Sequence, residues 1–98
     1  MLLIPEPAPF ELMIGDWTFA LTARQVARLR DAYDDVAIEG PGIVRCIPIT
    51  LACALHVEGR HDGGRITVWH RGQPTSSWAT TPYGDLLKVA AVFSNALR

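Results

Sequence analysis

The chain has 98 residues, 49% of them hydrophobic, so it can bury one modest core and is too apolar to be disordered. Its formal net charge of −1 at pH 7 argues against a general polyanion binder. Two cysteines are too few for a disulfide scaffold, and no stretch resembles a signal peptide or a membrane span. We therefore expect one cytoplasmic domain over residues 1–98, with reduced cysteines.

The first nine residues are predicted to form an extended, proline-rich arm. Residues 2–4 suit a short edge strand, and prolines at positions 5, 7 and 9 block both a helix and ladder pairing. A proline-rich ligand for another protein is the alternative, although no arginine flanks the prolines.

A hairpin over residues 10–21 is the element around which we expect the chain to pack. Apolar residues alternate before and after Gly15-Asp16, and their phase changes by one at that dipeptide. A two-residue loop there, with Gly15 at the positive φ of a type II′ turn, explains the change of phase. The loop would place six apolar side chains on one face: Phe10, Leu12, Ile14, Trp17, Phe19 and Leu21.

A helix is predicted to begin at Ala23, because Thr22 and Gln25 have the spacing of a capping box. Residues at helical spacing form its core face: Val26, Leu29, Tyr33 and Val36.

The opposite side of this helix carries a charged stripe, and its charges oppose the helix dipole. Two ion pairs, Arg28 with Asp31 and Arg30 with Asp34, would offset that cost. The stripe is either a solvated face or a second candidate partner-binding surface: Arg24, Arg28, Asp31 and Asp35.

Residues 43–57 are predicted to form a long strand, because seven of the eight odd positions are apolar. A break at Pro48 and a helix over 51–55 are alternatives. A turn with Asp62-Gly63 at its tip would lead to a return strand over 66–71. The core face then carries Leu55, Val57, Ile66 and Val68, and the opposite face carries His56, Glu58, Thr67, Trp69 and Arg71.

Residues 73–80 are predicted to be a polar loop that holds Trp78. A last helix would follow, with Thr81 as its N-cap and Ala96 near its end. It is apolar on most sides, so it is buried on more than one side or packs on another chain. We therefore predict an α+β fold in the order ββαββα, an antiparallel sheet with two helices packed on one face.

Neither a metal site nor a cofactor site is predicted. His56 and His70 fall on opposite faces of the second hairpin and His61 falls at its turn, so the three do not converge. His56 and Glu58 share a face and form the best candidate for an acid–base pair, but exposed pairs of this kind on a strand are commonly inert. The chain is accordingly expected not to be an enzyme, and an enzyme using this pair is the second alternative.

The predicted function is binding to another protein, as an inhibitor, immunity or adaptor protein of the phage or mobile-element type. A tryptophan among arginine and histidine has the composition of an interface hot spot. A single-stranded nucleic-acid binder is the first alternative, disfavoured by the acidic Glu58 and Asp62 nearby. A homodimer through the 82–97 helix or a sheet edge is also open. The candidate partner-binding residues are His56, Glu58, Arg60, Thr67, Trp69 and Arg71.

Overall fold

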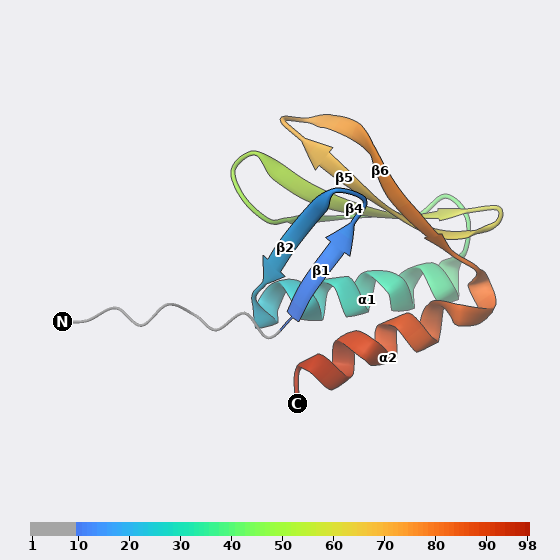
Figure 1. Cartoon of the computed structure of the whole chain (residues 1–98). Coiled ribbons are helices and arrows are strands. Elements are labelled where there is room, and N and C mark those ends of the chain that lie inside the picture. The colour runs from blue at the N-terminus through green and yellow to red at the C-terminus, as the bar shows by residue number, and fades with distance from the viewer. Residues whose placement is uncertain (1–9) are drawn as a thin grey trace.

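The computed structural model describes residues 10–98, so the predicted arm at 1–9 lies outside the described residues. The fold is α+β, as predicted, with two antiparallel sheets and two helices (Figure 1). The elements in chain order are β1 (Phe10–Ile14), β2 (Trp17–Leu21), α1 (Ala23–Glu39), β3 (Val44–Pro48), β4 (Cys53–Arg60), β5 (Gly63–His70), β6 (Gln73–Thr81), the 3-10 turn η1 (Tyr83–Asp85) and α2 (Leu86–Ala96).

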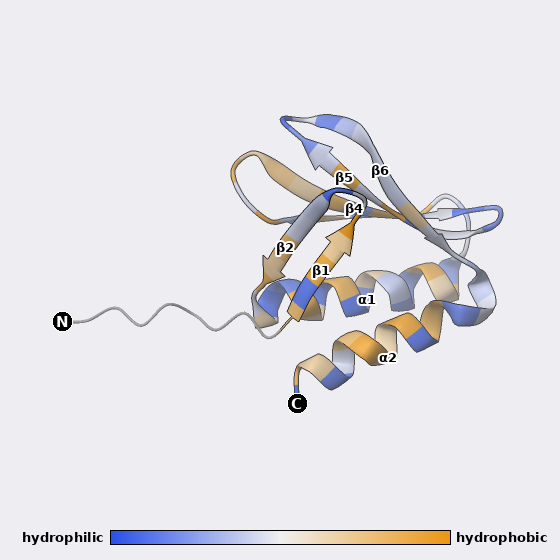
Figure 2. Ribbon diagram, viewed as in Figure 1, coloured by the Kyte–Doolittle hydropathy of each residue, from blue (hydrophilic) through white to orange (hydrophobic). Residues whose placement is uncertain are grey.

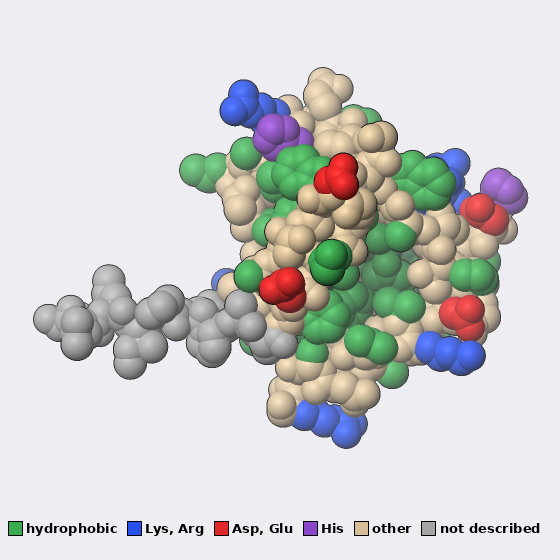
Figure 3. Space-filling view, in the orientation of Figure 1, with side chains coloured by type: hydrophobic (Ala, Val, Ile, Leu, Met, Phe, Trp, Pro, Cys, Tyr) green, Lys and Arg blue, Asp and Glu red, His purple; other side chains and the backbone are tan. Residues whose placement is uncertain are grey.

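The first hairpin has the predicted register. Ile14 pairs with Trp17, and Gly15 takes a φ of 57° in the turn between them. The hairpin is a separate two-stranded sheet, and its turn approaches β6, since a Cβ on Gly15 would lie 2.6 Å from Oγ of Ser77. Hydrophobic side chains are visible between β1 and β6 in Figure 3. The hairpin thus closes one side of the core, as its apolar face predicts.

Helix α1 begins where its capping box predicts. The Thr22 hydroxyl accepts a hydrogen bond from the Gln25 backbone N–H, and the Gln25 side chain accepts one from the Thr22 N–H. The four predicted core residues of α1 are all buried. Tyr33 of α1 packs against Phe93 of α2 with ring centroids 5.8 Å apart, and both helices lie on one face of the larger sheet (Figure 1).

The larger sheet is a four-stranded meander in the order β3-β4-β5-β6. The predicted long strand is broken after Pro48, and β4 begins at Cys53, so residues 51–55 do not form a helix. Odd-numbered residues of β4 point into the core, and the four predicted inward residues are buried: Leu55, Val57, Ile66 and Val68.

The tip of the β4–β5 hairpin is His61-Asp62, not the predicted Asp62-Gly63, because Arg60 pairs with Gly63. Gly63 and Gly64 instead belong to β5, at positions where neighbouring segments leave no room for a side chain. A Cβ on Gly63 would lie 2.0 Å from the Thr81 carbonyl oxygen, and one on Gly64 would lie 2.7 Å from the Leu86 side chain. The register moves by an even number of residues, so the predicted facing of every side chain in β4 and β5 is retained.

Residues 73–81 form strand β6, where a loop had been predicted. Its inward positions carry small residues such as Thr75 and Ser77, so hydrophobic alternation is absent from the sequence (Figure 2). Thr81 consequently ends β6 instead of capping a helix. Helix α2 begins at Leu86 after a 3-10 turn, with Asp85 as its N-cap residue, and it ends at Ala96 as predicted.

Candidate interaction surface

One face of the meander is turned away from both helices (Figure 1). We call this surface the outer face. The antiparallel register places Cys46, His56, Thr67 and Trp78 in one row across its four strands. Residues on this face include Val44, Cys46, Pro48, Ala54, His56, Glu58, Arg60, Arg65, Thr67, Trp69, Pro74, Trp78 and Thr80.

His56 and Trp69 are stacked on the outer face. Their ring centroids lie 4.2 Å apart and their planes differ by 11°. Burial lowers the pKa of His56 below 6.5, and the nearby Glu58 carboxylate opposes that shift. The stacked imidazole of His56 is a flat partner that fixes the indole.

A second pair on the outer face joins a cation to an indole ring. The guanidinium carbon of Arg65 lies 3.9 Å from the centroid of the Trp78 ring, and Arg65 Nε donates a hydrogen bond to the Thr80 hydroxyl at 3.2 Å. Trp78 nevertheless remains 49% exposed. Both tryptophans of the outer face are thus held in one orientation while part of each ring faces solvent.

A hollow of about 150 Å³ opens at the end of the outer face, between the β3–β4 loop and the β5–β6 turn. We call it the loop hollow. Its walls are joined, because the Arg71 N–H donates a hydrogen bond to the Ala52 carbonyl at 2.7 Å. Its lining residues are Pro48, Thr50, Leu51, Ala52, Cys53, Ala54, His56, Trp69 and Gly72.

The β5–β6 turn beside the hollow has an unusual first residue. Arg71 and Gly72 connect the paired residues His70 and Gln73, and their φ values of 53° and 76° define a type I′ turn. That turn favours Asn or Gly at its first position, whereas arginine adopts positive φ with strain. Arg71 is exposed and lies in this turn, not on the return strand predicted to contain it.

The other predicted partner-binding residues of this face are placed as follows. Glu58 accepts a hydrogen bond from Arg60 at 3.1 Å, and the backbone carbonyl of Arg60 accepts one from the Tyr83 hydroxyl. Thr67 lies on the outer face but is only 9% exposed, between the side chains of its neighbours in the row. His56 and Glu58 share the outer face and interact through charge, and among the described residues no hydrogen bond joins their side chains.

The charged stripe of α1 lies along the free edge of β3. In the antiparallel pair of β3 and β4, only every second residue of the β3 segment bonds to β4, as Ile43 does to Gly59 and Ile49 does to Cys53. The carbonyls of the residues between them point away from β4. Three side chains donate to these outward carbonyls: Arg45 to Val44 at 3.1 Å, Arg28 to Cys46 at 3.5 Å and Gln25 to Pro48 at 3.4 Å. The longer two are at the outer limit of hydrogen bonding.

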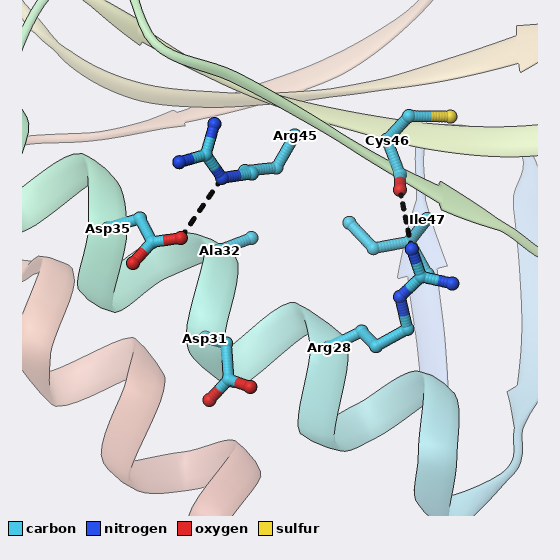
Figure 4. A pocket seen from close by; sticks show the side chains of 7 residues that line it. All are labelled: Arg28, Asp31, Ala32, Asp35, Arg45, Cys46 and Ile47. Atoms are coloured by element: carbon cyan, nitrogen blue, oxygen red, sulfur yellow. Dashed lines mark hydrogen bonds and ion pairs between the residues drawn. The ribbon is translucent and has the colours of Figure 1, made fainter.

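Figure 4 shows this edge from the side of a shallow groove of about 170 Å³, with Arg28 and Arg45 lying between helix and strand. Arg45 pairs with Asp35 at 3.0 Å, and Arg30 pairs with Asp31 at 3.1 Å. The predicted pairs of Arg28 with Asp31 and Arg30 with Asp34 do not form. Arg24 is exposed. Arg28 and Asp35 therefore help to cover a strand edge, a role that the stripe alone does not reveal.

The histidines and cysteines are dispersed. His56 lies on the outer face, His61 at a hairpin tip, and His70 on the inner side, 5.4 Å from the Trp17 ring. Both cysteines are free thiols. Within residues 10–98, no three His, Cys, Asp or Glu side chains gather in a way that could hold a metal ion.

Helix α2 packs on α1 along one side and leaves a partly apolar strip on the other. Leu87 is 61% exposed and Val92 is 52% exposed, with Lys88 and Asn95 between them on the helix surface. Neither α1 nor α2, the two α-helices of the described residues, has the length and hydropathy needed to span a bilayer.

Sequence reasoning missed two contributors to the outer face, Trp78 and Arg65. Trp78 was assigned to a loop, although Ser77-Trp78-Ala79-Thr80-Thr81 contains β-favouring residues that could have indicated an edge strand. Comparison of the chain with known protein families, with curated proteins and with solved structures finds no match. The geometry of the outer face is therefore the ground for a functional proposal.

Proposed function

We propose that the protein is a binding module that recognises another protein through the outer face. The supporting observation is that two tryptophans of the outer face, Trp69 and Trp78, are each fixed by a flat or cationic partner and each left partly in contact with solvent. Large aromatic side chains with little remaining freedom give contact area at a small entropic cost. Half-exposed Val44 adds apolar surface on β3 of the same face.

Two other binding modes are supported less well. A nucleic-acid base needs a free indole face amid several uncompensated cations, but His56 and Arg65 each cover one ring and Glu58 neutralises Arg60. Strand addition at β3 is opposed by the side chains that occupy its outward carbonyls. The inhibitor, immunity or adaptor role of a phage or mobile-element protein is a further part of the proposal, and it rests on small size and on the lack of recognised catalytic residues.

The test is affinity for a partner captured from the native host and then purified. Truncating an interface hot spot costs at least about 2 kcal/mol, or roughly thirtyfold in Kd, so Trp78→Ala should weaken binding by that order. Ile38→Ala is the control, because Ile38 is also an exposed large hydrophobic residue but lies on α1, away from the outer face. Equal affinities for Trp78→Ala and the wild type, with unchanged circular dichroism, would exclude the outer face.

Homodimerisation through α2 is a second candidate, favoured by the exposure of Leu87 and Val92. Light scattering at two concentrations measures it directly. A mass that rises with concentration in the wild type and stays monomeric in Leu87→Ala would support this interface, and a monomer throughout would exclude it.

A further inference from the structure

We infer that the loop hollow accepts one apolar side chain of the partner protein, and that Arg71 pairs with a carboxylate next to that side chain. This inference rests on the proposed function and adds the chemistry of the partner. The partner segment would carry a residue the size of leucine or phenylalanine next to Asp or Glu.

The size and lining of the hollow select an apolar group. A protein cavity of roughly 150 Å³ with an apolar lining holds benzene, so this volume suits the end of a leucine or phenylalanine side chain. Leu51, Ala54 and Trp69 contribute apolar surface. No lining residue carries a permanent charge, and burial lowers the pKa of His56, which disfavours its charged form. The hollow therefore disfavours a charged group in its interior.

The walls of the hollow are formed before a ligand arrives. The hydroxyl of Thr50 accepts hydrogen bonds from the backbone N–H groups of Ala52 and Cys53, at 3.2 and 3.0 Å, which orders the β3–β4 loop. The Arg71 N–H bond to the Ala52 carbonyl then ties that loop to the β5–β6 turn. A pre-formed site avoids the entropy loss of ordering loops on binding.

Arg71 carries a charge beside the hollow, because it precedes the lining residue Gly72 and its backbone N–H bonds to the lining residue Ala52. It is the one charged residue in the two segments that form the walls, residues 49–52 and 71–72. Its side chain is exposed, and no carboxylate of the described residues lies within ion-pair distance of it. Its backbone is held at positive φ, where Asn or Gly would be unstrained. Strain retained at the rim of a hollow points to a use for the guanidinium.

A carboxylate on a protein segment is the occupant that these features favour. One arginine cannot supply the several phosphate contacts that nucleic-acid affinity needs, nor the cluster of cations that binds an anionic membrane. A single guanidinium next to an apolar site instead matches an acidic residue adjacent to an apolar anchor.

The experiment follows the Trp69 indole N–H in ¹⁵N-labelled full-length protein during titration with capped peptides. Their central residues are Glu-Leu-Glu, Lys-Leu-Lys or Glu-Ala-Glu, with glycine on either side. We expect Glu-Leu-Glu to move the Trp69 signal and to bind up to about fivefold more tightly than Lys-Leu-Lys, the upper end of the range for one exposed ion pair. Glu-Ala-Glu should bind more weakly, because it leaves the hollow empty.

Two variants separate the parts of the inference. Arg71→Asn should abolish the preference for Glu over Lys and keep the preference for Leu over Ala. Ala54→Leu, which fills the hollow from its floor, should do the reverse. Equal binding of the Leu and Ala peptides, a Glu preference that survives Arg71→Asn, or no Trp69 shift with any peptide would overturn the inference. The Trp78→Ala affinity measurement would still decide the proposed function separately.

Discussion

Replacing Arg71 with asparagine should stabilise the fold while it removes a proposed binding group. Arg71 has a φ of 53° in a type I′ turn. An ordinary L-residue in this region costs roughly 1–2 kcal/mol, and Asn enters it several-fold more readily. The exposed Arg71 has no ion pair among the described residues, so little is lost with its side chain. We expect a gain of about 1 kcal/mol in the free energy of unfolding, which raises Tm by roughly 4–8 °C in a domain of this size.

Urea unfolding followed by tryptophan fluorescence measures this gain, with thermal circular dichroism as a second probe. The midpoint should rise with an unchanged m-value, since the surface exposed on unfolding stays the same. Asp16→Asn is the matched control. Asp16 is also an exposed residue of a two-residue hairpin loop, but its φ is not positive, so Asn should give no relief of strain there. A neutral or destabilising Arg71→Asn substitution would mean that contacts of the Arg71 side chain offset its backbone strain, so strain would not mark Arg71 as a binding residue.

Three further predictions test the structure. Arg28→Ala frees the outward carbonyl of Cys46, so sedimentation at increasing concentration should show more self-association than in Arg24→Ala, which changes an exposed arginine of the same helix. Because burial lowers the pKa of His56 in the folded protein, the unfolded chain binds a proton at His56 more tightly. The free energy of unfolding should therefore fall as the pH drops below about 6.5. In urea unfolding at several pH values, His56→Gln should reduce this dependence on pH. Burial raises the pKa of Tyr33 to about 12, so stability should decline as the pH rises above 10.0, and thermal melts of Tyr33→Phe should lack that decline.

Local signals in the sequence predicted much of this fold. Capping chemistry located the start of α1, and a change of hydrophobic phase at Gly15-Asp16 located the first hairpin, because both depend on residues close in the chain. The facing of β4 and β5 also followed from period-two alternation, which an even shift of the turn does not disturb.

The failures have a common physical origin in tertiary contacts. Gly63 and Gly64 resemble turn residues, but β5 needs them where Thr81 and Leu86 approach closely. Strand β6 was missed because its inward side carries small polar residues, and because Arg71-Gly72 lacks the Asn or Asp of a typical type I′ turn. The proposed site depends on the missed elements, since Trp78 lies on β6 and the loop hollow opens beside the Arg71-Gly72 turn.

The side chains that occupy the outward carbonyls of β3 have a consequence for how the protein opens. Gln25 and Arg28 reach those carbonyls only while α1 is docked, and the same helix buries Leu29 and Val36 in the core. A fluctuation that detaches α1 would expose part of the hydrophobic core and the unpaired edge of β3 at the same time. The stability of α1 against transient release therefore sets how often the chain presents a template for misassembly.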